Sequence, residues 1–236
     1  MPTRYMFSII IPVFYEAKII NTLLDSLDQL KSDESFEIFV VDGSPTQDTL
    51  QVISKKNVMK YISPQGRGRQ MNEGAAHATG DILIFLHADT FLPFNALSLI
   101  QTALENQHYV GGAFTLDIQS QNPLLKMIAA FSTLRSRLTR APYGDQAIFL
   151  RKSYFDTIGG YRDIPLMEDV ELMRRIKKKK GEIIILSTPV ITSDRRWNQE
   201  GMLYTTVRDL IIIFLYWCGV SAEKLAKFYS WQKPQE

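Results

Sequence analysis

The stretch Phe7-Ser8-Ile9-Ile10-Ile11-Pro12-Val13 is apolar along almost its whole length. Such a near-continuous run is typical of a strand that is buried on both faces of a parallel sheet. The same kind of run returns at 36–41 and 82–86, with a shorter one at 58–62. Helical patterns separate these runs, and the clearest has one apolar face: Ile20, Leu23, Leu24, Leu27 and Leu30. This alternation predicts a doubly wound α/β sheet over the first ~90 residues.

The second half of the chain alternates less regularly. Its patterns predict strands at 110–118, 147–150 and 182–186. They predict helices at 96–104, 123–138, 169–180, 202–218 and 221–229. A loop is predicted at 65–69, ahead of a helix that runs to about Ala78. We expect one α/β domain over 1–200, with halves that meet near residue 90, and a helical extension over 201–236.

The composition is that of an ordinary globular protein, with 45% hydrophobic residues and a net charge of +2 over 236 residues. This charge gives little support for nucleic-acid binding. The one cysteine, Cys218, excludes an intrachain disulfide framework and fits a reducing compartment. The run at 7–13 is too short for a signal peptide, and no window reaches the ~18 uncharged apolar residues that span a bilayer. We therefore expect a cytoplasmic protein.

Acidic residues follow the predicted strands at the points where parallel strands should end. Asp42 comes directly after the second strand, Asp89 comes shortly after the fourth, and Glu168-Asp169 opens a predicted helix. Open α/β sheets bind ligands beyond the carboxyl ends of their strands. Carboxylates gathered there repel one another unless a cation or a hydrogen-bond donor compensates. The pattern favours a site for a metal-bound nucleotide, with one carboxylate left for proton transfer.

Two common nucleotide-binding motifs are absent from the sequence. The first strand leads into Pro12 to Glu16, without the glycines of a dinucleotide fingerprint. The later segment Gly66-Arg67-Gly68-Arg69 lacks both a third glycine and the lysine of a P-loop. A nicotinamide enzyme and a P-loop NTPase are therefore disfavoured.

Several short segments follow one another in order along the chain. They are Ser8 to Glu16, Val40 to Ser44 with Asp48, Gly68 to Gly74 leading to Ala78 to Asp81, His87-Ala88-Asp89, Gly144-Asp145-Gln146 and Glu168-Asp169. Taken together, these segments resemble family 2 glycosyltransferases with the GT-A fold, over roughly residues 7–200. His87-Ala88-Asp89 stands where the family has Asp-x-Asp. With Arg195-Arg196-Trp197, this variant resembles a small bacterial subgroup that has a short C-terminal extension.

The resemblance implies a GT-A-like domain that moves a sugar from a nucleotide-sugar, with a UDP-sugar favoured, to a hydroxyl acceptor with inversion. It implies that Asp42 binds the base or ribose, although an Asx-turn would also explain this residue. Asp89 would hold Mn²⁺ or Mg²⁺, or else cap the following helix. His87 could ligate the metal, bond the ribose or simply pack. The other residues expected on the donor side are Pro12, Val13, Tyr15, Glu16, Ser44, Asn72 and Ala88.

Arginines are expected to bind the diphosphate. Arg67 and Arg69 flank Gly68 ahead of a helix N-terminus, which favours anions, and Arg69 is the preferred contact. Arg196 is a further candidate for diphosphate, and Trp197 for stacking on a sugar or acceptor. Position 193 is Ser rather than the Gln of processive relatives, so polymer synthesis is not expected.

The proton acceptor is expected on the far side of the sugar. The resemblance assigns the general base to Asp169, beside Glu168. Asp145 is the competing base or an acceptor-binding residue. Both acids of the 168–169 pair also suit a helix N-terminus.

The tail segment from Leu210 to Trp217 is apolar all round. It fits a helix packed on the domain or in a homodimer. It also fits an in-plane contact with the inner face of the cell membrane, or a groove for a lipid acceptor. Cations at Arg174, Arg175 and Lys177 to Lys180 could attract anionic lipid to such a contact.

Two rival functions stay open at this stage. A nucleotidyltransferase acting on a sugar phosphate also uses a strand-end carboxylate with Mg²⁺, but it usually begins with a glycine-rich loop after its first strand. A non-catalytic protein that binds nucleotide-sugars would need no base at Asp169.

Overall fold

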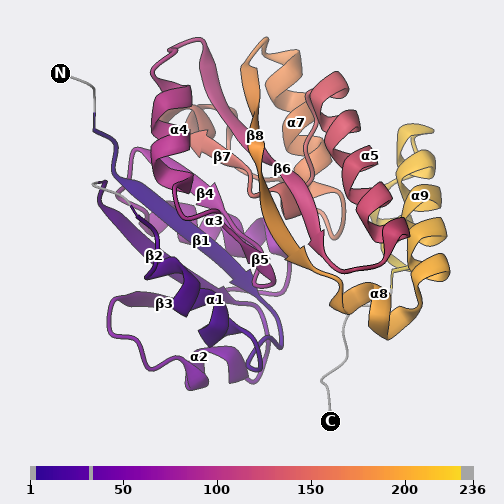
Figure 1. The fold of residues 1–236 in the computed structure, drawn as a ribbon, viewed down its shortest axis with the longest axis horizontal. Helices are drawn as coiled ribbons and strands as arrows, with labels where there is room; N and C mark the ends of the chain where they lie inside the picture. The colour runs from indigo at the N-terminus through magenta and orange to yellow at the C-terminus, as the bar shows by residue number, and fades with distance from the viewer. Residues whose placement is uncertain (1–3, 32–33, 230–236) are drawn as a thin grey trace.

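The structure is a computed structural model that describes residues 4–31 and 34–229 (Figure 1). One eight-stranded sheet runs through the described chain in the order β3-β2-β1-β4-β7-β6-β8-β5. The strands are β1 (Phe7–Val13), β2 (Phe36–Asp42), β3 (Val58–Ile62), β4 (Ile82–Phe85), β5 (Thr90–Phe91), β6 (Tyr109–Gln119), β7 (Phe149–Arg151) and β8 (Glu182–Ser193).

Helices flank this sheet. In chain order they are α1 (Ile20–Leu27), α2 (Asp48–Val52), α3 (Arg67–His77), α4 (Ala96–Leu104), α5 (Pro123–Thr139), the 3₁₀ turn η1 (Gly144–Gln146), α6 (Lys152–Ile158), α7 (Glu168–Lys178), α8 (Arg195–Glu200), α9 (Met202–Trp217) and α10 (Ala222–Ala226).

Most of the sheet is parallel. β1 pairs in parallel with β2 and β4, β2 pairs in parallel with β3, and β6 pairs in parallel with β8. Only β7 and β5 run against their neighbours. The prediction of a doubly wound, mostly parallel α/β sheet is therefore confirmed.

The central strand β1 explains why its sequence is apolar throughout. All seven of its residues are buried. Ile9 and Ile11 belong to a core cluster shared with α1 and α4. Ile10 points to the opposite face, into a second cluster shared with α3, α6 and α7. A strand with a hydrophobic layer on each face has no solvent side to alternate with.

Several predicted boundaries were wrong, and two of the errors have clear causes. α3 begins at Arg67, inside the predicted loop. Gly68, which suggested a loop, is instead required by packing within the helix, since a Cβ there would lie 2.7 Å from the carbonyl oxygen of Arg162. β8 continues past Leu186 to Ser193, and its Pro189 follows a register shift against β6. Proline is tolerated at such an irregularity. Elements β5, η1, α6 and α8 were not predicted.

The C-terminal helices pack on the domain through one side only. Ile212 of α9 and Leu225 of α10 join a small cluster with Leu166, Met167 and Val170. The other side of α9 is exposed, with Phe214 at 66% and Trp217 at 62%. Among the described residues, none of the helices is long and apolar enough to cross a bilayer. The predicted division at residue 200 stays a prediction, and residues 230–236 of the predicted extension lie outside the described ranges.

Candidate active site

Predicted site residues lie at the carboxyl ends of two parallel strands. Asp42 is the last residue of β2 and lies opposite Val13 of β1. His87 and Asp89 follow β4, whose exit is fixed by a hydrogen bond from the Leu86 amide to the Ile10 carbonyl. Asp42, His87 and Asp89 thus lie at the carboxyl ends of β2 and β4, the two strands on either side of β1, where an open α/β sheet binds its ligand.

Asp42 is fully buried and only half satisfied. Its Oδ1 accepts a 2.7 Å hydrogen bond from the Ser44 amide, as in an Asx-turn. Its Oδ2 has no partner among the residues that the structure describes. Burial raises the pKa of this carboxyl above its usual value. The turn and the ligand role therefore coexist, because one buried acceptor oxygen stays available for an N–H or O–H donor.

Gln70 of α3 fixes the backbone beside Asp42, and sequence reasoning missed it. Its amide Nε2 donates to the carbonyls of Val13 (2.7 Å) and Val41 (2.8 Å). Gly43 is needed here because a Cβ would meet the Gln70 side chain at 2.9 Å. A buried glutamine on the sheet side of an otherwise apolar helix face was the signal for this role.

Arg195 ties α8 to the end of β1. Its guanidinium makes two hydrogen bonds with Glu16, at 2.7 and 2.9 Å, and lies 3.7 Å from Oδ2 of Asp89. Burial raises the pKa of both Glu16 and Asp89, and Arg195 opposes the rise. Glu16, expected on the donor side, is therefore already paired, and the role of Arg195 was not predicted.

Asp89 offers one hard oxygen ligand rather than a complete metal site. Its side chain is 28% exposed. Across residues 4–31 and 34–229, no three His, Cys, Asp or Glu side chains are grouped closely enough to hold a metal ion. A carboxylate still suits Mn²⁺ or Mg²⁺, provided that the remaining oxygen ligands come from a bound molecule or water. The residues present fit a cation that arrives with its ligand.

His87 packs between the two halves of the site. A Cβ on Gly144 would lie 2.7 Å from His87 Nε2 and 3.6 Å from Oδ2 of Asp169, so these three residues are neighbours. Burial, helped by the cations Arg67 and Arg196, lowers the pKa of His87 to about 3. The imidazole is therefore neutral at physiological pH.

The acceptor side holds the predicted carboxylates in different states. Asp169 accepts hydrogen bonds from the amides of Gly144 and Val170, both at 2.7 Å. Asp145 has a buried Oδ1 with no partner in the described chain. Its pKa is raised to about 6 by burial first and then by Asp169. Glu168 is buried and lies 2.8 Å from Arg67 Nε, so it is held in an ion pair.

The two arginines of the Gly66–Arg69 segment point to different places. Arg67 faces the site through its ion pair with Glu168, and its cation also acts on His87. Arg69 is exposed and makes two 2.6 Å hydrogen bonds to Asp163. This arrangement reverses the sequence-based preference for Arg69 and favours Arg67.

Arg196 and Trp197 lie in the first turn of α8, beside the site. Arg196 hydrogen-bonds to Asp209 and to the hydroxyl of Tyr229, and its charge contributes to the lowered pKa of His87. Trp197 packs against a small cluster that includes Leu125 and Ala129. The indole is therefore part of the packing between α5 and the tail.

The remaining donor-side candidates contribute mainly backbone or support. Pro12, Val13 and Ala88 are buried, and the hydroxyl of Ser44 accepts from the Gln47 amide. Asn72 uses its whole side-chain amide on the backbone of Tyr161, with both hydrogen bonds at 2.8 Å, so its role here is to join α3 to the second half.

Unusual backbone conformations mark the loops around the site. Tyr15, Ala147 and Met167 are non-glycine residues with φ of +58°, +47° and +66°. Such conformations cost about 1–3 kcal/mol each and gather at functional sites. Met167 directly precedes Glu168 and Asp169. Its strained backbone therefore fixes the point at which α7 begins, and with it the position of these two carboxylates.

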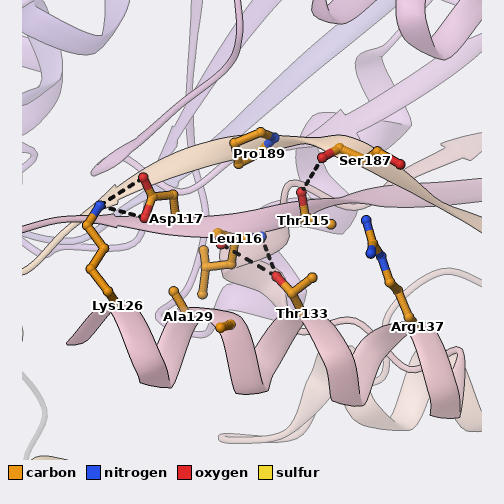
Figure 2. Close-up of a pocket in the computed structure, with 10 residues that line it drawn as sticks. Thr115, Leu116, Asp117, Lys126, Ala129, Thr133, Arg137, Ser187 and Pro189 are labelled. Atoms are coloured by element: carbon orange, nitrogen blue, oxygen red, sulfur yellow. Dashed lines mark hydrogen bonds and ion pairs between the residues drawn. The ribbon is translucent and has the colours of Figure 1, made fainter. Parts of the chain in front are cut away.

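A separate cavity of about 330 Å³ lies under α5 and has none of the predicted site residues in its lining (Figure 2). The carboxylate cluster at the strand ends is therefore the stronger candidate site.

Comparison with known proteins agrees with this geometry. The family model described as Glycosyl transferase family 2 matches residues 8–162. A PGL/p-HBAD biosynthesis glycosyltransferase from Mycobacterium tuberculosis (strain ATCC 25177 / H37Ra) is 32% identical over 164 residues. That match covers 66% of this chain and 63% of the relative, so the chain corresponds to less than two thirds of that protein.

Solved structures share the fold at low sequence identity. Staphylococcus aureus TarS, in complex with UDP, has a TM-score of 0.63 at 20% identity, covering 80% of this chain and 60% of that one. A mannosyltransferase from Pyrobaculum calidifontis, in complex with GDP-Man and Mn²⁺, has a TM-score of 0.55 at 19% identity, covering 81% and 57%. With the family match over most of the parallel sheet, these findings show that the chain belongs to glycosyltransferase family 2.

Proposed function

We propose that this protein transfers a sugar from a nucleotide-sugar, with a UDP-sugar favoured, to a hydroxyl acceptor, with inversion and with a divalent cation. The observation that carries the proposal is the meeting of a donor-side and an acceptor-side carboxylate group around His87. The Gly144 amide donates a hydrogen bond to Asp169, and Gly144 packs against the imidazole of His87, which follows β4. A reacting sugar between the two groups would face both.

On the donor side, Asp42 would accept a hydrogen bond from the base or ribose through its unpartnered Oδ2. The complexes of one structurally similar protein, TarS, with UDP and with UDP-GlcNAc support a uridine nucleotide. Gln70 joins the end of β1 to the end of β2 beside Asp42, so the acceptor oxygen is already in place before the ligand arrives. Such preorganisation limits the entropy lost on binding.

The diphosphate would lie near the cations at the strand ends. Arg67 and Arg196 both help to lower the pKa of His87, and we propose that one of them contacts a phosphate bound near the imidazole. Asp89 would hold Mn²⁺ or Mg²⁺, and such a cation neutralises charge on a departing nucleoside diphosphate. We propose that His87-Ala88-Asp89 replaces Asp-x-Asp, with a neutral imidazole in place of the first carboxylate.

On the acceptor side, Asp169 would take the proton. The acceptor oxygen would form a bond to the anomeric carbon while the bond from that carbon to the phosphate oxygen breaks. The acceptor proton would pass to the Asp169 carboxylate, and the single displacement inverts the anomeric centre. The amide of Gly144 orients this carboxylate at 2.7 Å. Asp145 is the competing base because its pKa near 6 suits a proton acceptor at neutral pH.

The proposal is tested first by thermal stabilisation with UDP, GDP and their sugar derivatives, with and without Mn²⁺, in the wild type and in Asp89→Ala. A ligand that binds only the folded state raises Tm by mass action. We expect a uridine nucleotide to raise Tm in the wild type, with a metal-dependent part that Asp89→Ala removes. No shift with any saturating nucleotide would contradict the proposal.

Turnover separates the proposed reaction from its rivals. Release of nucleoside diphosphate is expected for sugar transfer, whereas a nucleotidyltransferase would release pyrophosphate and incorporate a nucleoside monophosphate. A binding protein would give neither product, and Asp169→Asn would leave its ligand affinity and function intact.

A further inference from the structure

The exposed apolar side chains of this protein are concentrated on two helices. Twelve of the seventeen large hydrophobic side chains that are exposed in the described chain lie on α5 and α9. The two helices are adjacent (Figure 1), and Ile128 of α5 and Met202 of α9 pack in one small cluster. We call the exposed apolar side chains of α5 and α9 the α5–α9 face. Monomeric soluble proteins rarely expose large apolar patches without a partner.

On α5 the exposed apolar residues form one stripe at spacings of three and four: Leu124, Met127, Phe131, Leu134 and Leu138. The opposite side of the helix makes its own attachments to the sheet. Thr133 accepts a hydrogen bond from the Leu116 amide, and Lys126 pairs with Asp117 (Figure 2). The stripe is therefore not needed to hold α5 on the domain.

On α9 the exposed stripe is wider and uncharged. Leu203, Val207, Leu210, Phe214 and Trp217 follow one another at helical spacing, with Tyr204 beside them. The charged residues of this helix, Arg208 and Asp209, are paired with Glu200 and Arg196 on another side. Aromatic residues at the edge of an apolar helix face are typical of helices that lie in a membrane interface.

Cations border this face without acidic residues among them. Residues 123–140 contain four Lys or Arg and no Asp or Glu, and residues 172–181 contain six and none. The two segments adjoin, because Lys177 donates to the Thr139 carbonyl at 3.1 Å and Arg140 donates to the Ile183 carbonyl at 2.8 Å. Arg174 also lies over the ring of Tyr216 on α9. We call these exposed cations at the ends of α5 and α7 the basic rim.

We propose that the α5–α9 face and its basic rim dock on an anionic lipid bilayer, with α5 and α9 in the plane of the surface. The charge distribution decides between this occupant and a second copy of the chain. A two-fold dimer places the same patch on both sides of the interface. The basic rim would then meet no acidic partner, whereas anionic headgroups neutralise it.

Docking would also orient the candidate site. Tyr143 and Met167, which directly precede the Gly144–Gln146 turn and Glu168, pack in the same cluster as Ile212 of α9. A docked α9 therefore holds the acceptor side next to the bilayer. This consequence rests on the proposed function and favours a membrane-borne hydroxyl acceptor.

The test is co-sedimentation of the full chain with vesicles of phosphatidylcholine alone or mixed with phosphatidylglycerol, without nucleotide, so that its outcome is independent of turnover. Strong binding is expected only to the anionic vesicles, and high salt should weaken it. Phe131→Glu combined with Phe214→Glu should lower the partition coefficient about 100-fold, roughly tenfold for each phenyl group. Phe94→Glu is the matched control, since Phe94 is as exposed (62%) as Phe131 (61%) but lies outside the face.

A second variant tests the rim independently of the apolar residues. Lys178→Gln with Lys179→Gln should weaken binding about 25-fold, roughly fivefold for each charge. Unchanged thermal melts would exclude misfolding of the variants, all of which carry substitutions at exposed positions. Failure of the wild type to bind anionic vesicles would overturn the proposal. The proposal would also be overturned if sedimentation equilibrium showed a dimer that Phe131→Glu with Phe214→Glu dissociates, while the wild type bound no vesicles.

Discussion

The donor side and the acceptor side of the candidate site are built in different ways. Asp42 is the last residue of β2 and Asp89 comes shortly after β4, so parallel strands of a regular sheet position both. Asp145 and Asp169 lie in a 3₁₀ turn and at a helix start, which are joined by one hydrogen bond from Gly144. The sheet therefore fixes the donor-side pair, whereas the acceptor-side pair depends on contacts between segments that are distant in the sequence.

The largest effect is expected at Asp169. Asp169→Asn keeps an oxygen that can accept the Gly144 amide but cannot take up a proton. We expect turnover to fall about 10³-fold, the usual contribution of a general base, with donor affinity unchanged. Turnover is followed by release of nucleoside diphosphate, with water as acceptor if no hydroxyl compound is known. Donor affinity is followed by thermal stabilisation.

Asp145→Asn is the matched comparison for this base assignment. The two carboxylates lie on the same side of the site and differ in their partners. If Asp145→Asn removed turnover and Asp169→Asn did not, the base would be Asp145. The acceptor side would then be wrongly assigned, while the donor side would be unaffected.

The next largest effect is expected at Asp42, on the donor side. In Asp42→Asn one oxygen can still accept the Ser44 amide, but the free position becomes an NH₂ group that opposes a ligand donor. Donor affinity should fall about 10–100-fold, as for loss of a hydrogen bond to a charged group. Asp156→Asn is the control, because Asp156 is an exposed residue of α6 whose partner is Lys152. Isothermal titration with the donor measures both, and equal losses would show that Asp42 makes no specific contact.

Much of the donor side could be predicted because its signals are local. An apolar run followed by an acid gives both the strand and the residue at its end, and β1, β2 and β4 bear this out for Asp42 and Asp89. Gly68 shows the limit of that logic. In the sequence this glycine suggests a loop, yet it lies in α3. Glycine is needed there because the close approach of Arg162 leaves no room for a side chain.

The ion pairs of the site could not be predicted, because their partners are far apart along the chain. Nothing near Glu16 in the sequence points to Arg195, and nothing near Arg67 points to Glu168. The sequence therefore favoured Arg69, which is exposed in the structure. Tertiary packing decides which of two similar side chains faces a site.

Arg67 and Arg69 provide a matched pair for the third prediction. Arg67→Gln leaves Glu168 buried without its cation, and we expect a loss of about 2 kcal/mol, less than for a fully enclosed pair because the Arg67 side chain is 36% exposed. Burial raises the pKa of Glu168 in the folded protein, and Arg67 opposes the rise. Without Arg67, this pKa moves further above its value in the unfolded chain. Stability is then lost as pH rises, so the loss should be larger at pH 8 than at pH 5.

Arg69→Gln removes the same charge from an exposed ion pair, so Tm should be unchanged. Thermal melts at both pH values measure the pair of variants. Donor affinity should fall only in Arg67→Gln. Equal effects of the two substitutions would remove the argument that Arg67 faces the site.

The smallest effect is expected from Asp145, and it is a gain in stability. Burial raises its pKa to about 6 in the folded state, so the folded protein binds this proton more tightly than the unfolded chain does. The stabilisation is complete below about pH 4 and is lost as pH rises through 6. Asp145→Asn removes the buried charge, so at pH 8 it should be more stable than the wild type by about 1–2 kcal/mol. Melts at pH 8 and pH 4.5 should show a Tm gain at the first value that largely disappears at the second. Such a gain, combined with impaired turnover, would mean that the carboxylate is kept for function at a cost to stability, whereas an equal gain at both values would trace the effect to packing.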